Sequence, residues 1–543
     1  MVFARRSTTL LAAIIASCAM VLSLTACTSD NKTVVDGQTT VTSNSAGGVA
    51  VFTPSDGITL NQQTPLNKWA KLVPDLTKAL VDAGFKKGDI NHTTSDSLDK
   101  QSRAIQDFVV DHLSNNTTDD SGIAIAPDNM TLLVAPVVEA DASTRQYGDY
   151  VSQNLSTNDV TDEGATSDGE SSEDDSSKDD SSNTESDSTA SDEQAQAVDR
   201  LVSSLKLAKE SGMHVVLLGN SIEGYKPDAF VKFSDAQTIG KLQAEKMVSK
   251  LKLDKASKDN PKYIEVLLPY TAVDEKGNAN DSTFAQEAFR GIWQVLGSYY
   301  QKGVVESPSG TLDGKSTEND WQAVAYDAAK EGSTAKVLDK RLAKTDGQST
   351  LTRIDGIITM NDYIASEVVK ELDDLGYTGS AADINPQITI SGIVGNITGK
   401  KDLSRDAVPD PIKSPENDNA NDSSSSDDDA DEDTSASDKD RDSQWPLVTG
   451  YGAHVSNIPS IVNGKQWMTG MEDRQTIATD IAQACAKLNK DEALNSMPSI
   501  RNSEVGGVKK IPTISEPLLA VSASNLKSAL IDPGYISLAD AGL

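Results

Sequence analysis

Short apolar runs alternate with longer segments of helical periodicity along most of the chain. The apolar runs predict strands, at residues 48–53, 90–94, 132–137, 214–218, 263–268, 356–360, 388–393 and 447–449, with a weaker one near 303–305. Helices are predicted between them, at 66–83, 98–112, 197–211, 236–252, 283–302, 321–331, 333–343 and 363–375. Apolar strands that alternate with helices indicate parallel sheets covered on both faces. Because the strands are too many for one compact sheet, we predict an α/β fold with two doubly wound parallel-sheet lobes.

The N-terminus has the pattern of an export signal. Ala4-Arg5-Arg6 precedes an apolar run at residues 10–24, which is shorter than the roughly 20 apolar residues of a spanning helix. Leu24-Thr25-Ala26-Cys27 then resembles a bacterial lipobox. We predict a lipoprotein signal peptide at 1–26, lipidation at Cys27 and a flexible anchor linker at 27–47. A plain signal peptide with an incidental cysteine is the alternative.

The cysteines indicate that the exported chain has no internal disulfide. Of the three cysteines, Cys18 lies in the signal peptide, Cys27 would carry lipid, and Cys485 lies in an apolar, Ala-rich helical pattern. A single remaining thiol cannot make an internal disulfide. Stability is therefore expected to come from buried apolar surface.

The net charge of −33 is concentrated in two tracts. Residues 158–193 hold fourteen acidic residues and one lysine, and residues 415–443 hold twelve acidic and two basic residues. With almost no aliphatic residues, these tracts cannot offset the entropy of ordering. We therefore predict disordered acidic insertions at 156–196 and 408–444, and we expect no nucleic-acid partner. Weak binding of divalent cations or of a basic wall component is the alternative role for the insertions.

Candidate binding residues follow the predicted strands, because parallel sheets bind ligands at the carboxyl ends of their strands. Amides and indole rings recur there: Trp69, Asn220, Asn280, Trp321, Asn361 and Asp362. An amide offers a donor and an acceptor together, and an aromatic face covers the apolar side of a sugar ring. This set predicts a neutral, polyhydroxylated ligand. Each of these residues also has an interpretation without a ligand. Asn361 stands where a helix N-cap belongs and could serve only as the cap. Trp69 and Trp321 could be ordinary core residues.

Catalytic and metal-binding motifs are missing from the sequence. It contains no HExxH, no GxSxG and no CxxC pair. The histidines lack metal-ligand spacing: His92, His112, His214 and His454. We expect a binding protein that has no cofactor and is not an enzyme.

Four stretches occur in an order typical of one family. They are VKFSDAQTIGKLQAEKMV (231–248), IDGIITMNDYIASEVVKELDDLGYTG (354–379), VTGYGAHVSNIPSIVNGKQWMTG (448–470) and IPTISEPLLAVSASNLKSALIDPGY (511–535). On these stretches the chain resembles the type I periplasmic binding proteins of bacterial sugar ABC importers, and most closely the xylose-binding and multiple-sugar-binding group. The resemblance covers residues 48–543 apart from the two acidic insertions.

The resemblance implies two lobes joined by a three-strand hinge, near 233–236, 468–473 and 514–520. The N-terminal lobe would comprise residues 48–235 and 470–515. The C-terminal lobe would comprise residues 236–469 and 516–543. A monomer of this kind closes its lobes around a sugar and delivers the sugar to a membrane permease.

The resemblance also implies roles for individual residues. It places Trp69 and Trp321 as sugar-facing rings, Asn361 with Asp362 as the binding amide and its neighbour, and Asn278 or Asn280 on an Asn-bearing loop. Three charged contacts of the family are absent, since this chain has Asn220-Ser221 for Asp-Arg, Gly452 for Asp and Glu472 for Lys. Charge-assisted hydrogen bonds are the strong ones. Because three such contacts are absent, the identity of the ligand stays open, and xylose itself is doubtful.

The function predicted from the sequence is sugar capture at the outer face of the bacterial cytoplasmic membrane. The chain would be anchored there by lipid at Cys27 and would serve an ABC permease. Two other classes remain: a sensor subunit that presents a bound sugar or signal molecule to a membrane kinase, and an enzyme or degenerate surface lipoprotein without a transport role.

Overall fold

The computed structural model describes residues 32–35, 38–41, 46–55, 65–115, 125–138, 145–157, 185–273, 280–343, 351–381 and 445–543. The chain divides into two units, Met1–Asn44 and Ser45–Leu543. Several predicted features lie outside the described residues: the signal peptide, Cys27, Asn278, the strand predicted at 388–393, most of the first acidic insertion and all of the second. No described helix is both long enough and apolar enough to cross a membrane.

The first unit contains a pair of antiparallel strands, β1 (Lys32–Val35) and β2 (Gln38–Val41). The sequence predicts a flexible linker here, and the strands depart from that expectation. Their sequences, KTVV and QTTV, are rich in β-branched residues, which favour strands. Asp-Gly stands between them in the sequence, a pair typical of two-residue hairpins.

A seven-stranded sheet forms the first part of the second unit, in the order β17-β18-β9-β7-β5-β3-β4. Five strands run parallel: β3 (Gly48–Pro54), β4 (Ile90–Ser95), β5 (Met130–Val134), β7 (His214–Leu218) and β9 (Ala229–Val231). β18 (Val508–Ile514) is parallel to β9 and antiparallel to the edge strand β17 (Ile500–Val505). Strands such as β5, with the sequence MTLLV, are buried throughout because helices cover both faces of the sheet.

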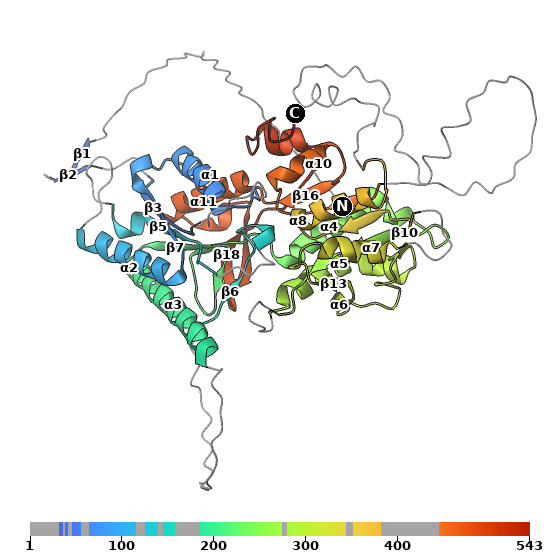
Figure 1. The fold of residues 1–543 in the computed structure, drawn as a ribbon. Helices are drawn as coiled ribbons and strands as arrows, with labels where there is room; N and C mark the ends of the chain where they lie inside the picture. Colours follow the sequence, from blue (N-terminus) through green and yellow to red (C-terminus); the bar gives the residue numbers. More distant parts are fainter. Residues whose placement is uncertain are drawn as a thin grey trace, which may run out of the picture. The chain divides into compact units, whose positions relative to one another are not determined.

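Two pairs of helices cover this sheet, one pair on each face (Figure 1). One face carries α1 (Trp69–Asp82) and α11 (Arg474–Leu488), and the other carries α2 (Leu98–Asn115) and α3 (Glu185–Glu210). Cys485 is buried in α11, and this burial raises the pKa of its thiol.

A four-stranded parallel sheet forms the second part, in the order β12-β10-β14-β15. Its strands are β10 (Lys262–Val266), β12 (Val305–Glu306), β14 (Gly356–Ile358) and β15 (Leu447–Thr449). Its helices are α4 (Ala236–Leu251), α5 (Thr283–Gln301), α6 (Trp321–Val324), α7 (Ser333–Arg341) and α8 (Asp362–Asp374). The two sheets, parallel apart from the edge strand β17, confirm the prediction of a doubly wound α/β fold.

Helices α4 and α5 cross in close contact because each has a glycine at the crossing. A Cβ atom at Gly240 would lie 2.2 Å from the carbonyl oxygen of Ala288. A Cβ atom at Gly291 would lie 2.0 Å from the carbonyl oxygen of Gln237. Any side chain at either position would force the two backbones apart.

The chain passes three times between the parts that hold the two sheets. The crossing connections are residues 232–235 between β9 and α4, 472–473 between β16 (Met468–Met471) and α11, and 515–518 between β18 and β19 (Leu519–Ser522). β16 and β19 pair antiparallel. The residue boundaries of the two lobes stay a prediction.

Two helices differ from their predicted bounds by more than three residues. α3 begins at Glu185 rather than at 197, so the end of the predicted acidic insertion is helical, and its Ala, Glu and Gln residues are good helix formers. α6 ends at Val324 instead of continuing to 331. The next residues form β13 (Ala325–Tyr326), which pairs with β11 (Leu268–Pro269), so tertiary pairing overrides the local helical pattern.

Candidate functional site

Residues 146–155, here called the bridging segment, contact elements from both parts of the second unit. The Tyr147 ring lies 4.8 Å from the ring of Phe284 and 6.2 Å from that of Tyr451, among the core residues of the four-stranded sheet. The Tyr150 ring packs instead in the core on the seven-stranded sheet. The segment therefore joins the two cores through two tyrosines that are three residues apart.

Trp69 lies against the bridging segment at the start of α1, and it is only 3% exposed. Its ring meets the ring of Tyr150 edge-on at 5.0 Å, and Tyr150 stacks on Phe233 at 4.7 Å. The backbone amide of Trp69 donates to Asp149 Oδ2 at 3.1 Å, and Lys68 Nζ lies 3.0 Å from Asp149 Oδ1. Trp69 is thus buried, as the core alternative expects, but its neighbours include the bridging segment.

Asn220 holds the other end of the bridging segment, just after β7. Its Oδ1 accepts from the backbone amide of Gln153 at 2.9 Å, and its Nδ2 donates to the carbonyl oxygen of Pro136 at 2.9 Å. Next to it, β6 (Asn154–Leu155) pairs in parallel with β8 (Ser221–Ile222). The Asn220 amide is therefore engaged at both of its polar atoms.

Asn361 caps α8 through one atom of its amide and contacts the bridging segment through the other. Its Oδ1 accepts from the backbone amide of Ile364 at 2.9 Å, which caps the N-terminus of α8. Its Nδ2 donates to Oε1 of Gln146 at 3.0 Å. The cap leaves the amide nitrogen free to face the bridging segment, so the cap and the contact with Gln146 use different atoms of Asn361.

Asp362 lies behind this contact and is fully buried. Its carboxylate accepts from Nε2 of Gln466 at 2.7 Å, from Oγ1 of Thr469 at 2.9 Å and from the backbone amide of His454 at 2.9 Å. Burial raises the pKa of Asp362, and these donors oppose the rise. Asp362 thereby positions His454, whose Nε2 lies 3.1 Å from the carbonyl oxygen of Gln146.

Asn280 and Trp321 lie apart from this group. Asn280 Nδ2 donates to the carbonyl oxygen of Thr271 at 2.9 Å, and the Trp321 ring meets Tyr270 edge-on at 5.1 Å. Both belong to the part with the four-stranded sheet, and no contact found among the described residues joins either of them to the bridging segment. The structure thus brings Trp69, Asn220 and Asn361 together around one segment, while the ligand role of all six predicted residues stays a prediction.

Two positions that depart from the family pattern also lie near the bridging segment or a crossing connection. A Cβ atom at Gly452 would lie 3.2 Å from the His454 ring and 3.6 Å from the carbonyl oxygen of Gln146, and φ at this glycine is +110°, so an aspartate here would strain the backbone and press on the His454 ring. Glu472 is buried on the second crossing connection, and it accepts from the backbone amide of Ser234, on the first connection, at 2.6 Å. Burial raises the pKa of Glu472 to about 7.

Sequence reasoning missed the bridging segment itself. Its sequence, QYGDYVSQNL, has neither helical nor strand periodicity and stands directly before an acidic tract. The available signal was a pair of tyrosines within a polar stretch, since large aromatic residues seldom stay in solvent. The contacts that it contributes come from Gln146, Tyr147, Asp149, Tyr150 and Gln153.

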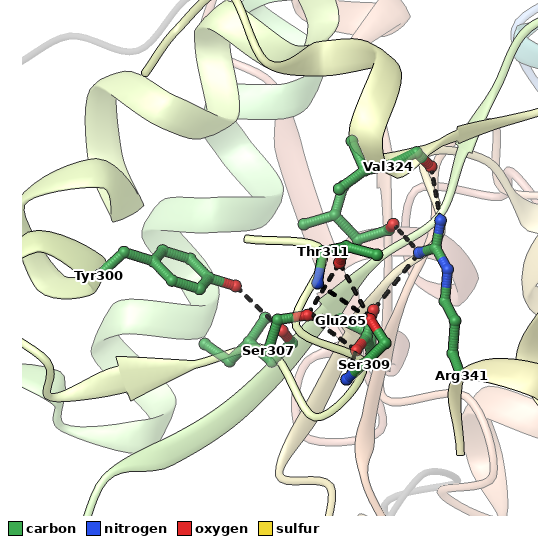
Figure 2. Close-up of polar contacts among 9 residues, drawn as sticks. Glu265, Tyr300, Ser307, Ser309, Thr311, Val324 and Arg341 are labelled. Atoms are coloured by element: carbon green, nitrogen blue, oxygen red, sulfur yellow. Dashed lines mark hydrogen bonds and ion pairs between the residues drawn. The ribbon is translucent and has the colours of Figure 1, made fainter. Parts of the chain in front are cut away.

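A second buried polar cluster surrounds Glu265 on β10 (Figure 2). Its Oε1 accepts from Oγ of Ser307 and from the backbone amide of Ser309, both at 2.8 Å, and its Oε2 lies 3.3 Å from Nη1 of Arg341. Arg341 also donates through Nη2 to the carbonyl oxygen of Val324 at 2.9 Å. The ion pair ties β10, the loop after β12 and α7 together, so we assign it a structural role. In the described ranges, no group of three or more His, Cys, Asp or Glu residues is placed to hold a metal ion.

Comparison with known proteins gives matches to solved structures only. No protein-family model and no curated protein sequence matches the chain. A solute-binding protein of an ABC transporter from Clostridium phytofermentans, with bound β-D-glucose, is similar at 16% identity over 91% of this chain and 99% of that chain, with a TM-score of 0.44.

Two further structures are similar at the same level. A carbohydrate-transporter solute-binding protein from Chloroflexus aurantiacus, in complex with D-glucose, shares 18% identity over 92% of this chain and 98% of that chain, with a TM-score of 0.42. An arabinose-binding protein from Geobacillus stearothermophilus shares 10% identity over 89% of this chain and 99% of that chain, also with a TM-score of 0.42. These solved proteins are of the kind that the sequence motifs resemble.

Proposed function

We propose that the chain is an extracytoplasmic solute receptor that captures a sugar for an ABC permease and is anchored to the membrane by lipid at Cys27. The observation that supports this function is the convergence of Trp69, Asn220 and Asn361 on the bridging segment. They follow β3, β7 and β14, which belong to two different sheets. Such convergence at the carboxyl ends of strands is typical of ligand sites in doubly wound folds.

The ligand class follows from the groups that converge. Two amides and an indole offer neutral donors, acceptors and an apolar face, a set that suits a polyhydroxylated ligand. A solute that contacts both sheets favours their closed arrangement by its differential affinity. The three crossing connections would absorb the rotation, and a permease would bind the closed form. The receptor makes and breaks no covalent bond.

The test is a thermal-shift screen of the full chain against pentoses, hexoses and oligosaccharides, followed by calorimetry. A sugar at 100 times its dissociation constant should add about 2.7 kcal/mol of stability. In the segment-replaced chain described below, Asn220→Ala should weaken binding about tenfold through loss of one amide, while Asn319→Ala in the same chain, at an exposed position, serves as the matched control. The proposal fails if no sugar binds either the wild-type chain or the segment-replaced chain described below.

One observation favours a second candidate, a surface lipoprotein without a transport role. The polar atoms of Asn220 and Asn361 are all engaged within the chain. A protein that never binds a solute needs no unoccupied hydrogen-bond donors or acceptors around the bridging segment. The same screen separates the two candidates, since the second predicts that no sugar binds in any variant.

A further inference from the structure

We propose that the bridging segment is a resident occupant of the solute site and that a solute binds only when this segment leaves. The inference rests on the proposed function and goes beyond it, because it assigns an autoinhibitory role to residues 146–155. Three observations support the proposal: the atoms that the segment shares with a solute, its contacts to both parts of the second unit, and the buried polar atoms near it that have no hydrogen-bond partner.

The segment uses the groups that a sugar would need. Its departure would free Oδ1 of Asn220 as an acceptor and Nδ2 of Asn361 as a donor. It would also uncover the ring of Trp69, which Tyr150 now meets edge-on. A solute and the segment therefore compete for the same atoms, and both cannot be bound at once.

The segment also connects the two parts of the second unit in the way that a ligand of a two-lobed receptor does. Tyr150 packs with Trp69 and Phe233 on the seven-stranded side, while Tyr147 packs with Phe284 and Tyr451 on the four-stranded side. Any ligand that contacts both sides stabilises their closed arrangement. The segment would thus hold the chain closed without a solute.

The polar contacts around the segment are incomplete. Among the described residues, three buried side-chain atoms at or beside it have no hydrogen-bond partner: Asn67 Nδ2, Ser152 Oγ and His454 Nδ1. The backbone of Asn67 accepts from Asp149, and the ring of His454 contacts the carbonyl oxygen of Gln146. An unpaired buried polar group costs about 1–3 kcal/mol. A better-matched solute could recover part of this free energy, which makes the segment displaceable.

Gly148 offers a point variant that weakens the fit. Its φ is +98°, and a Cβ atom there would lie 2.6 Å from the carbonyl oxygen of Asn67. Gly148→Ala should therefore loosen the segment through a clash and a strained backbone. Ser156→Ala, at an exposed position just after the segment, is the matched control.

The experiment compares three full chains by calorimetry with the same sugar panel: the wild type, the Gly148→Ala variant, and a chain whose residues 146–155 are replaced by Gly and Ser. A synthetic peptide of residues 145–157 is the second probe. We expect both variants to bind a sugar at least about tenfold more tightly than the wild type, because the competing occupant is weakened or absent. We also expect the peptide to restabilise the segment-replaced chain and to compete with the sugar.

Equal sugar affinity in the wild type and both variants would overturn the inference while leaving the proposed function intact. If the segment-replaced chain fails to fold, the sugar affinities of Gly148→Ala and Ser156→Ala are compared instead. Tighter binding by Gly148→Ala supports the inference, and equal binding overturns it. If no sugar binds any chain but the peptide restabilises the segment-replaced chain, the solute receptor is rejected and occupancy of the site by the segment is supported. Absence of both sugar and peptide binding would overturn the inference.

Discussion

Glu472 shows how one buried carboxyl couples two crossing connections. It lies on the second connection and accepts from Ser234 on the first. Burial raises its pKa from 4.5 to about 7, so the folded chain holds a proton that the unfolded chain releases between these two pH values. Its contribution to stability is therefore full below about pH 4.5 and is lost as the pH rises through about 7.

We predict that the wild type loses up to roughly 3 kcal/mol between pH 5 and pH 8 relative to Glu472→Gln, since one pKa unit corresponds to about 1.4 kcal/mol. Urea unfolding at both pH values measures the difference. Glu318→Gln, at an exposed position, is the control and should follow the wild type. If Glu472→Gln and the wild type respond to pH identically, Glu472 is not buried as described.

A separate prediction concerns Arg341, because its guanidinium group forms an ion pair with the fully buried carboxylate of Glu265. Arg341→Met leaves Glu265 unpaired and should cost about 3–5 kcal/mol in the free energy of unfolding by urea. Arg290→Met removes the partner of Glu287 at a partly exposed site and should cost less than about 1 kcal/mol. Equal losses in the two variants would show that the pair at Glu265 is not buried from solvent.

At the scale of elements, the crossing of α4 and α5 depends on the absence of side chains. Gly291→Val would place atoms within the backbone of α4 and should destabilise the chain by more than about 2 kcal/mol. Gln294→Val, one turn away at an exposed position of α5, adds the same β-branch without a clash and should stay within about 1 kcal/mol of the wild type. Thermal and urea unfolding compare the two variants. Similar stabilities would mean that the helices do not cross at this glycine.

Helices and strands whose apolar residues recur at a clear spacing could be predicted from the sequence. β7 has the predicted bounds, and α4 ends one residue before its predicted end, because an unbroken apolar run and an i, i+3, i+4 pattern each favour one structure. The bridging segment could not be predicted, since it lacks a period and is held by tertiary contacts to Trp69, Asn220 and Asn361. These three site candidates were found because they follow strands, and their shared partner was missed.

At the scale of the whole molecule, the sequence predicted two parallel sheets because apolar strands alternate with helices. It could not predict that residues 146–155 contact residues from the parts that hold both sheets. The local sequence of a polar loop in solvent does not differ from that of a polar segment packed in a site. The proposed occupancy of the solute site by the bridging segment would change the behaviour expected of a receptor. The unliganded chain would be closed, and sugar affinity would be limited by release of the segment.

Hydrogen–deuterium exchange of residues 146–155 in the full chain tests this claim most directly. The amides of Asp149 and Gln153 donate to Asn67 and Asn220, so the account predicts slow exchange without sugar and faster exchange when a bound sugar displaces the segment. Exchange at the rate of the free peptide before any sugar is added, or slow exchange that a bound sugar leaves unchanged, would contradict it.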